Sequence, residues 1–139
     1  MIRYTNQIPV EDYQRLRASV GWRHISDKQA ENAVNNCFYA VCCLDDDRVI
    51  GITRLLWDGD YCVYLSDVIV EEPWRGRGIA THMIRMCLDH LHEQLEPGDV
   101  VKIFLMAAKG REGFYEQFGF RCRPNEEDGA GMEQWIEKR

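Results

Sequence analysis

The chain has 139 residues, of which 45% are hydrophobic and 29% are charged, and its formal net charge at pH 7 is -6. This composition is typical of a soluble globular protein, and the length favours a single domain over residues 1–139. The acidic balance argues against a general nucleic-acid-binding protein, which needs a basic face, and mildly favours a cationic partner. No apolar run is long enough to span a membrane, and the N-terminus lacks the apolar core of a signal peptide, so we expect a cytoplasmic protein.

The first half of the chain reads as one short strand, two helices and a three-strand meander. Apolar residues at helical spacing after Pro9 predict the first helix, and Ser26 or Asp27 is expected to cap the second. Polar turns at 45–47 and 57–60 separate apolar runs that are typical of antiparallel strands. The expected strands cover residues 2–5, 37–44, 48–57 and 61–70, and the expected helices cover residues 9–20 and 26–35.

The second half begins with a helix from Gly78, whose apolar stripe indicates one broad buried face. Because this helix crosses between the strand at 61–70 and the next strand, at 100–106, these two strands are expected to run parallel. A short helix is expected at 113–118, followed by strands at 120–123 and 132–137. The predicted order is β-α-α-β-β-β-α-β-α-β-β. It indicates an α/β (α+β) fold with a mixed, mostly antiparallel sheet around a central parallel strand pair.

The six cysteines are expected to be reduced and mostly buried. Most of them lie inside apolar runs, and no two form a C-x-x-C pair. Free cysteine is among the most buried residue types, so this distribution favours thiols over a disulfide framework. The histidines show no metal-ligand spacing with the cysteines, and we expect no metal site.

A glycine-rich turn, Arg75-Gly76-Arg77-Gly78-Ile79-Ala80, joins the strand at 61–70 to the long helix. Glycines allow a close backbone approach, and the free N–H groups at a helix start suit a phosphate. No G-x-x-x-x-G-K-[ST] motif is present, which excludes a Walker A loop. A dinucleotide-binding turn needs a third glycine where this chain has Thr81, and the remaining chain is too short for a doubly wound sheet. A purely structural surface turn is the remaining alternative.

The hexapeptide also matches the pattern Gln/Arg-x-x-Gly-x-Gly/Ala, and residues 114–120, FYEQFGF, match F-Y-x-x-x-G-F downstream of it. With the order of elements along essentially the whole chain, these motifs resemble the GNAT family of N-acetyltransferases, in particular its small bacterial single-domain members. The resemblance implies an acyltransferase that moves an acetyl group from acetyl-CoA to a primary amine by direct transfer in a ternary complex. Members often dimerise, which leaves a homodimer open here.

The resemblance assigns the coenzyme site to the glycine turn and to the strand before it. The turn would hold the diphosphate through its N–H groups, and at least one of its arginines would reach a phosphate. In the family, this strand parts from its parallel neighbour, and the pantetheine arm pairs with the exposed backbone. The coenzyme-binding residues so implied are Val68, Ile69, Val70, Arg75, Gly76, Arg77, Gly78, Ile79 and Ala80.

Acetyl transfer needs an acid for the departing thiolate and a donor for the oxyanion. Tyr115 stands at the general-acid position of the family, and a phenol pKa of about 10 suits that role. A packing tyrosine beside Phe114 is the alternative. A backbone N–H of Val68 or Ile69 is expected to stabilise the oxyanion.

The general base is the least defined part of the expected site. Members with a glutamate or histidine base carry it at positions that fall on Tyr64 and Ser66 here. Asp67, acting through ordered water, is therefore the candidate base, and a structural hydrogen-bond acceptor is the equally weighted alternative for it. Strand alternation puts the even-numbered residues of 64–70 on one face and the odd-numbered ones, Asp67 included, on the other.

The acceptor pocket is expected between the first two helices, their connector and the last hairpin. Trp22, Tyr64 and Ser66 are the candidate substrate-binding residues. The acidic charge and the aromatic residues favour a small primary amine, such as an arylalkylamine or a polyamine. Two alternatives stay open, namely acetylation of a protein lysine or N-terminus, and a non-catalytic module that only binds acyl-CoA.

Overall fold

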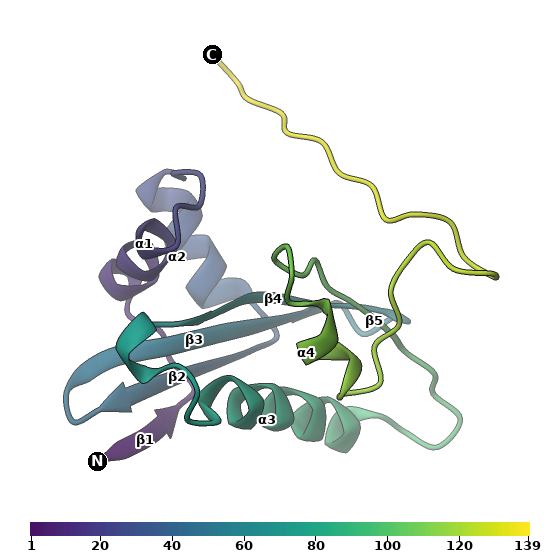
Figure 1. Cartoon of the computed structure of the whole chain (residues 1–139), viewed down its shortest axis with the longest axis horizontal. Coiled ribbons are helices and arrows are strands. Elements are labelled where there is room, and N and C mark those ends of the chain that lie inside the picture. Colours follow the sequence, from purple (N-terminus) through teal and green to yellow (C-terminus); the bar gives the residue numbers. More distant parts are fainter. The chain divides into compact units, whose positions relative to one another are not determined.

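The computed structural model describes all 139 residues, which form two compact units, residues 1–105 and 106–139. The first unit holds a five-stranded sheet and three α-helices (Figure 1). No helix of the chain has both the length and the apolar character needed to cross a membrane. The elements of the first unit are β1 (Ile2–Thr5), α1 (Val10–Ser19), α2 (Asp27–Asn36), β2 (Tyr39–Asp45), β3 (Arg48–Trp57), β4 (Cys62–Val70), the 3-10 helix η1 (Glu72–Trp74), α3 (Ile79–Gln94) and β5 (Lys102–Phe104).

The strands of the sheet lie in chain order, from β1 at one edge to β5 at the other. Neighbouring strands are antiparallel except β4 and β5, which pair in parallel. The long helix α3 makes the crossover that this parallel pair requires. The expected α/β fold with a mixed, mostly antiparallel sheet is therefore confirmed.

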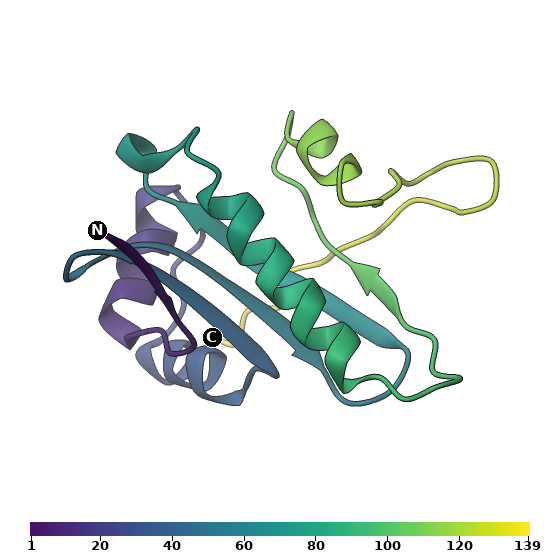
Figure 2. The same ribbon diagram turned by 90° about the horizontal axis from the view of Figure 1, so that it is seen from below.

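Helices cover both faces of the sheet (Figures 1 and 2), with α3 on one face and α1 and α2 on the other. On the α3 face, the ring of Tyr39 stacks on His90 of α3 with 4.1 Å between the ring centroids. On the opposite face, Tyr13 and Leu16 of α1 are fully buried against Ile52 of β3. The central strands β2 and β3 therefore send alternate side chains into two separate apolar layers.

The start of α3 lies close against the sheet because β3 carries a glycine there. A Cβ added at Gly51 would lie 3.4 Å from the Ile79 side chain and 3.4 Å from the Ile69 carbonyl oxygen. The N-terminus of α3, and with it the glycine turn, is thus fixed against β3 and β4.

The other helix starts follow the sequence signals. Ser26 caps α2 in a capping box, in which its side chain accepts a hydrogen bond from the Gln29 N–H and the Gln29 side chain accepts one from the Ser26 N–H. α1 begins directly after Pro9.

All six cysteines are free, as expected. Cys42, Cys43 and Cys87 are buried, whereas Cys62 and Cys122 are exposed. Burial raises the pKa of Cys42 to about 11 and that of Cys87 to about 12, so these thiols stay protonated and unreactive near neutral pH.

The C-terminal unit contains one regular element, the short helix α4 (Glu112–Glu116). The predicted strands at 120–123 and 132–137 are not formed, and this part of the prediction was wrong. Both segments are short, and a strand persists only where a neighbouring strand takes up its N–H and C=O groups. The hydrogen bonds here are local instead, such as the one from the Asn125 N–H to the Asp128 carbonyl oxygen. The apolar side chains of the last segment, including Met132 and Ile136, are exposed.

Candidate active site

A β-bulge interrupts β4 at the centre of the expected site. In the register of β3 and β4, Arg54 lies opposite Ser66 and Ile52 lies opposite Ile69. One residue of β3, Thr53, therefore faces two residues of β4, Asp67 and Val68. Asp67 has a φ of 57°, in the left-handed region that residues with a side chain rarely adopt.

The bulge changes which side chains share a face of β4. Ser66 lies opposite Arg54, which in turn lies opposite Ala40, and Ala40 belongs to the core on the α1 and α2 face. Asp67 and Ile69 point to this same face, since Asp67 bonds to α1 and Ile69 packs in its core. The prediction that the odd-numbered residues of 64–70 form one face was therefore wrong, because strict alternation assumes a strand without a bulge.

The bulge also changes which backbone groups face away from β3. Before it, the Tyr61 carbonyl accepts from the Lys102 N–H of β5, so alternation turns the backbone groups of Ser66 toward β3, where the Thr53 side-chain hydroxyl donates to the Ser66 carbonyl. After it, the Glu71 N–H bonds to Ile50 of β3. Counting back by alternation from Glu71, the backbone groups of Val68 and Val70 face away from β3, and those of Ile69 face toward it.

β5 does not follow β4 to its end. The two strands pair only over Cys62–Tyr64 and Lys102–Phe104, whereas β4 continues to Val70. We call the side of residues 65–70 that β5 does not pair the unpaired edge of β4. The N–H of Val68 lies on this edge.

Asp67 is held by donors from two elements, α1 and β3, and we call this group the Asp67 cluster (Tyr13, Arg17, Arg54 and Asp67). Its carboxylate accepts hydrogen bonds from the Tyr13 hydroxyl at 2.7 Å and from Arg54 Nε at 2.6 Å. An Arg17 Nη atom lies 3.6 Å from its other oxygen. The Asp67 side chain is 8% exposed and both arginine side chains are 12% exposed, so solvent screens these ion pairs weakly.

Two members of the Asp67 cluster, Tyr13 and Arg54, have raised pKa values. Burial and the neighbouring carboxylate of Asp67 raise the pKa of Tyr13 to about 12, so its hydroxyl is a permanent donor near neutral pH. Burial, the largest single influence, would lower the pKa of Arg54, but the charge and hydrogen bond of Asp67 together with Tyr13 and Cys37 raise that pKa. With two arginines and one carboxylate, the cluster has a formal charge of +1.

The glycine turn has the conformation that a close anion requires. Gly76 and Gly78 have φ values of 78° and 80°, and a Cβ at either would meet nothing within 4 Å. Gly78 is the N-cap of α3 and offers no side-chain acceptor, and the first intrahelical bond of α3 runs from the His82 N–H to the Gly78 carbonyl. The N–H groups of Ile79, Ala80 and Thr81 therefore point out of the helix end without an intrahelical acceptor.

The two arginines of the turn differ in their contacts. Arg75 donates through Nε to the Val70 carbonyl at 2.8 Å, which ties the turn to the end of β4. Arg77 donates to the Pro73 carbonyl at 3.2 Å and is exposed.

An ion-pair clamp on Glu71 lies between β4 and the glycine turn. The buried carboxylate of Glu71 accepts from Arg48 at 2.9 and 3.1 Å and forms a short hydrogen bond with Arg15. Burial alone would raise the pKa of Glu71, but the hydrogen bonds from Arg48 and Arg15 outweigh it and hold that pKa below its usual value. The clamp thus joins α1 and β3 to the start of the turn.

The candidate acceptor residues gather on the α1 and α2 side of the sheet. Trp22 follows α1, and the Arg17 guanidinium lies 5.5 Å from the centroid of its ring. Ser66 and, by alternation, Tyr64 share the β4 face that carries Asp67. Trp22 is 38% exposed, so an aromatic surface is available to a ligand next to the Asp67 cluster.

Tyr115 belongs to the C-terminal unit, where it lies on α4. Its ring makes edge-to-face contacts with Phe114 at 5.1 Å and with Phe120 at 6.4 Å. Burial raises the pKa of Tyr115, against a smaller lowering by Arg111. The side chain is therefore a protonated phenol through the neutral range, which is the state that a general acid needs.

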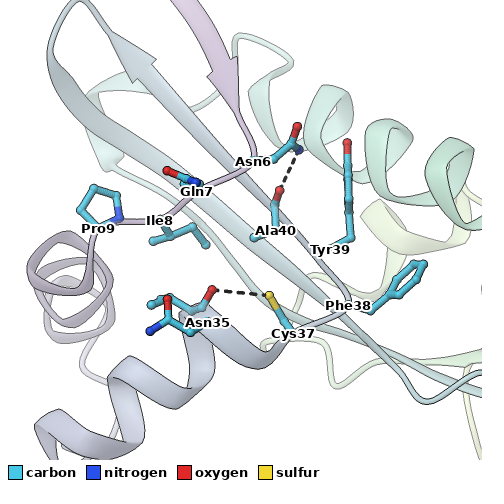
Figure 3. A pocket seen from close by; sticks show the side chains of 10 residues that line it. Asn6, Gln7, Ile8, Pro9, Asn35, Cys37, Phe38, Tyr39 and Ala40 are labelled. Carbon is cyan, nitrogen blue, oxygen red and sulfur yellow. Dashed lines mark hydrogen bonds between the residues drawn. The ribbon is translucent and has the colours of Figure 1, made fainter.

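A cavity of about 540 Å³ lies elsewhere in the first unit, between the segment after β1, the end of α2 and the start of β2 (Figure 3). Asn6 and Asn35 line it with Cys37 and Tyr39, and Asn6 donates to the Ala40 carbonyl at 2.9 Å. None of the expected site residues lines this cavity, and no charged side chain does. No group of three or more His, Cys, Asp or Glu side chains could hold a metal ion.

Comparison with known proteins decides the family. A model of the acetyltransferase (GNAT) family matches residues 4–120, which is most of the chain. The chain belongs to the GNAT family. It is therefore an acyltransferase enzyme, as its sequence motifs indicated.

Individual GNAT relatives agree with this assignment. An uncharacterized N-acetyltransferase of Gracilaria tenuistipitata var. liui is 24% identical over 128 residues, which is 89% of this chain and 68% of that protein. A GNAT family acetyltransferase of Streptococcus pneumoniae superposes with a TM-score of 0.78 at 26% identity, covering 100% of this chain and 98% of that one. A protein of unknown function from meticillin-resistant Staphylococcus aureus has the same fold, with a TM-score of 0.84 at 24% identity over 97% of this chain and 100% of that one.

Sequence reasoning missed the partners of two buried carboxylates of this GNAT protein. The spacing of apolar residues predicts only a helix around Tyr13, and the apolar run at 48–57 predicts only a strand around Arg54. A signal was present, because Arg54 and Asp67 each interrupt an otherwise apolar strand, and the two strands are antiparallel neighbours. Opposite charges in that arrangement are typical of a cross-strand ion pair.

Proposed function

We propose that this GNAT enzyme transfers the acetyl group of acetyl-CoA to a small primary amine and that residues 1–139 act as one catalytic domain. The observation that carries the proposal is the unpaired edge of β4, which leads directly into a glycine turn with two left-handed glycines and an uncapped helix start. A strand edge offers N–H and C=O groups to an amide-containing chain, and a helix N-terminus suits a diphosphate. Acetyl-CoA contains an amide-containing pantetheine arm followed by a diphosphate.

The glycine turn fits the diphosphate by shape and charge. The space beside Gly76 and Gly78 is free of protein atoms, so a phosphate can approach the backbone. The N–H groups from Arg77 to Ala80 would donate to it, and the exposed guanidinium of Arg77 would add a charge. Val68 and Val70 would pair with the pantetheine amides.

For the chemistry, we assign one role to each of two groups. The amine attacks the thioester carbonyl, and the N–H of Val68 would stabilise the resulting oxyanion, because among the two candidates it is the one on the unpaired edge. Tyr115 would protonate the departing thiolate as the bond to the carbonyl carbon breaks. The proton of the attacking amine would leave through ordered water.

An arylalkylamine suits the acceptor side better than a polyamine does. Trp22 presents a partly exposed indole beside Arg17 of the Asp67 cluster, and Tyr64 and Ser66 lie on the face of β4 that carries Asp67. The Asp67 cluster carries a net positive charge there, which would repel the additional ammonium groups of a polyamine.

The experiment is a thiol-release assay with acetyl-CoA and a panel of arylalkylamines, polyamines, lysine peptides and peptides with free N-termini. We expect the highest kcat/KM with an arylalkylamine. Turnover on peptides but not on free amines would instead identify a protein acetyltransferase. Calorimetric binding of acetyl-CoA without transfer to any acceptor would identify a non-catalytic module. Gel filtration of the same preparation with light scattering would report whether the enzyme is a homodimer.

A further inference from the structure

We propose that Asp67 is a positioning residue, whose carboxylate is anchored by Tyr13 and Arg54 so that the bulge of β4 directs the Val68 N–H to the unpaired edge. The inference rests on the proposed function for its chemical meaning, since it concerns the geometry of the donor that would stabilise the oxyanion. Its first support is the backbone itself. Asp67 and Asp46 are the only residues other than glycine with positive φ, and Asp46 lies in an exposed hairpin turn.

The conformation of Asp67 needs an external cause. The left-handed region places Cβ too close to the following carbonyl oxygen, so an L residue in mid-strand does not choose it on local grounds. The cause lies in the anchors of the carboxylate. The Tyr13 hydroxyl and Arg54 Nε bond to it at 2.7 and 2.6 Å, and its side chain is almost completely buried.

The anchors are themselves fixed. Tyr13 is 1% exposed in the core between α1 and the sheet. Arg54 lies on β3 and donates a second hydrogen bond, of 3.0 Å, to the Ala33 carbonyl of α2. The Asp67 side chain is thus tied directly to α1 and β3, and through Arg54 to α2.

The consequence for catalysis follows from the register. In a β4 without the bulge, alternation from Ser66 would turn the N–H of Val68 toward β3 and that of Ile69 toward the unpaired edge. The anchored carboxylate therefore determines which N–H is presented. Both hydrogen bonds fall on one oxygen of Asp67, Oδ2, and an Arg17 Nη atom lies 3.6 Å from the other oxygen, so cationic and phenolic groups surround the carboxylate, which suits an anchor.

Three substitutions at one position separate the backbone role from a proton-transfer role. Asp67→Gly removes the carboxylate but adopts a φ of 57° without strain. Asp67→Asn keeps a hydrogen-bond acceptor and tolerates the same φ. Asp67→Ala has no side-chain acceptor and is strained at this φ. We expect kcat/KM to fall about 10-fold for Asn and Gly and at least 100-fold for Ala, comparable with the loss of an oxyanion donor. The acidic limb of the pH–rate profile should not move in Asn or Gly.

Tyr13→Phe is the matched anchor variant, since it deletes one oxygen and keeps the buried ring. We expect kcat to fall about 10-fold, with the KM for acetyl-CoA changed less, and the double variant Tyr13→Phe/Asp67→Asn to be no worse than Asp67→Asn alone. Thermal melting of each variant checks that the folded fraction is the same at the assay temperature. If Asp67→Ala does not fold at the assay temperature, the activities of Asp67→Gly, Asp67→Asn and Tyr13→Phe still distinguish the positioning role from the proton-transfer role.

A spectroscopic readout keeps the inference distinct from the proposed function. In 15N-valine-labelled protein, acetyl-CoA should shift the Val68 amide signal in the wild type and in Asp67→Gly, and not in Asp67→Ala. A wild-type enzyme that binds acetyl-CoA but transfers no acetyl group would defeat the proposed function while leaving this test intact. Equal inactivity of Asn, Gly and Ala with loss of the acidic limb would make Asp67 the base and overturn the inference, as would equal full activity of all three.

Discussion

At the scale of single residues, this GNAT protein separates charged groups that hold the backbone from the phenol that would take part in the reaction. The carboxylates of Asp67 and Glu71 are both buried and both paired with arginines. Tyr115 lies against the aromatic rings of Phe114 and Phe120. The two kinds of residue should respond differently to substitution and to pH.

Tyr115→Phe should lower kcat by about 10²–10⁴-fold, because a general acid contributes in that range, and should leave the Kd for acetyl-CoA nearly unchanged. In the wild type, kcat should hold to alkaline pH and fall only above pH 10.0, because burial raises the pKa of Tyr115 above that value and the protonated form is the active one. The measurement is kcat against pH with an acceptor amine that is fully neutral across the range. A full-rate Phe variant with an unchanged alkaline limb would remove Tyr115 from the mechanism.

Glu71→Gln should destabilise the protein at neutral pH by about 1–3 kcal/mol, since Arg15 and Arg48 lose their ionic acceptor but are exposed enough to be rehydrated. The pKa of Glu71 is lowered in the folded state, so its contribution is full above the unfolded pKa and is lost as pH falls through the folded one. Urea unfolding at pH 7 and pH 3 measures both effects. The exposed neighbour Glu72 serves as the control, and Glu72→Gln should change little.

At the scale of elements, the glycine turn places a left-handed glycine, Gly78, at the N-terminus of α3. Gly78→Ala forces a left-handed alanine at the N-cap of α3, which should cost about 1–2 kcal/mol and weaken acetyl-CoA binding at least 10-fold. Gly59→Ala is the matched control, because Gly59 has a φ of 92°, also has open space around it, and lies in the hairpin between β3 and β4. Calorimetric titration should show the loss of affinity in Gly78→Ala alone, with similar melting temperatures for the two variants. Equal affinities would place the diphosphate elsewhere.

At the scale of the whole molecule, the prediction of one domain over residues 1–139 has a thermodynamic test. A single domain should unfold in one cooperative step, so the calorimetric and van't Hoff enthalpies should agree. Two transitions, or a van't Hoff enthalpy well below the calorimetric one, would show that residues 1–105 and 106–139 unfold separately. Repeating the scan with saturating acetyl-CoA should raise the melting temperature by mass action on the folded state.

The sequence by itself determined the features that depend on neighbouring residues. Helix spacing, the Ser26 cap, the apolar runs of β2–β4 and the glycine turn are local patterns, and each was predicted within a few residues. The strands predicted at 120–123 and 132–137 are absent because a short segment becomes a strand only where a partner strand accepts and donates its backbone hydrogen bonds.

The tertiary structure alone decided the bulge at Asp67, the Asp67 cluster and the direction of the Val68 N–H. Asp67 is bonded to Tyr13, 54 positions away, and to Arg54, 13 positions away. No local pattern encodes a left-handed aspartate in mid-strand, because its cause is the sum of hydrogen bonds from α1 and β3 that exist only once the sheet and its helices have packed.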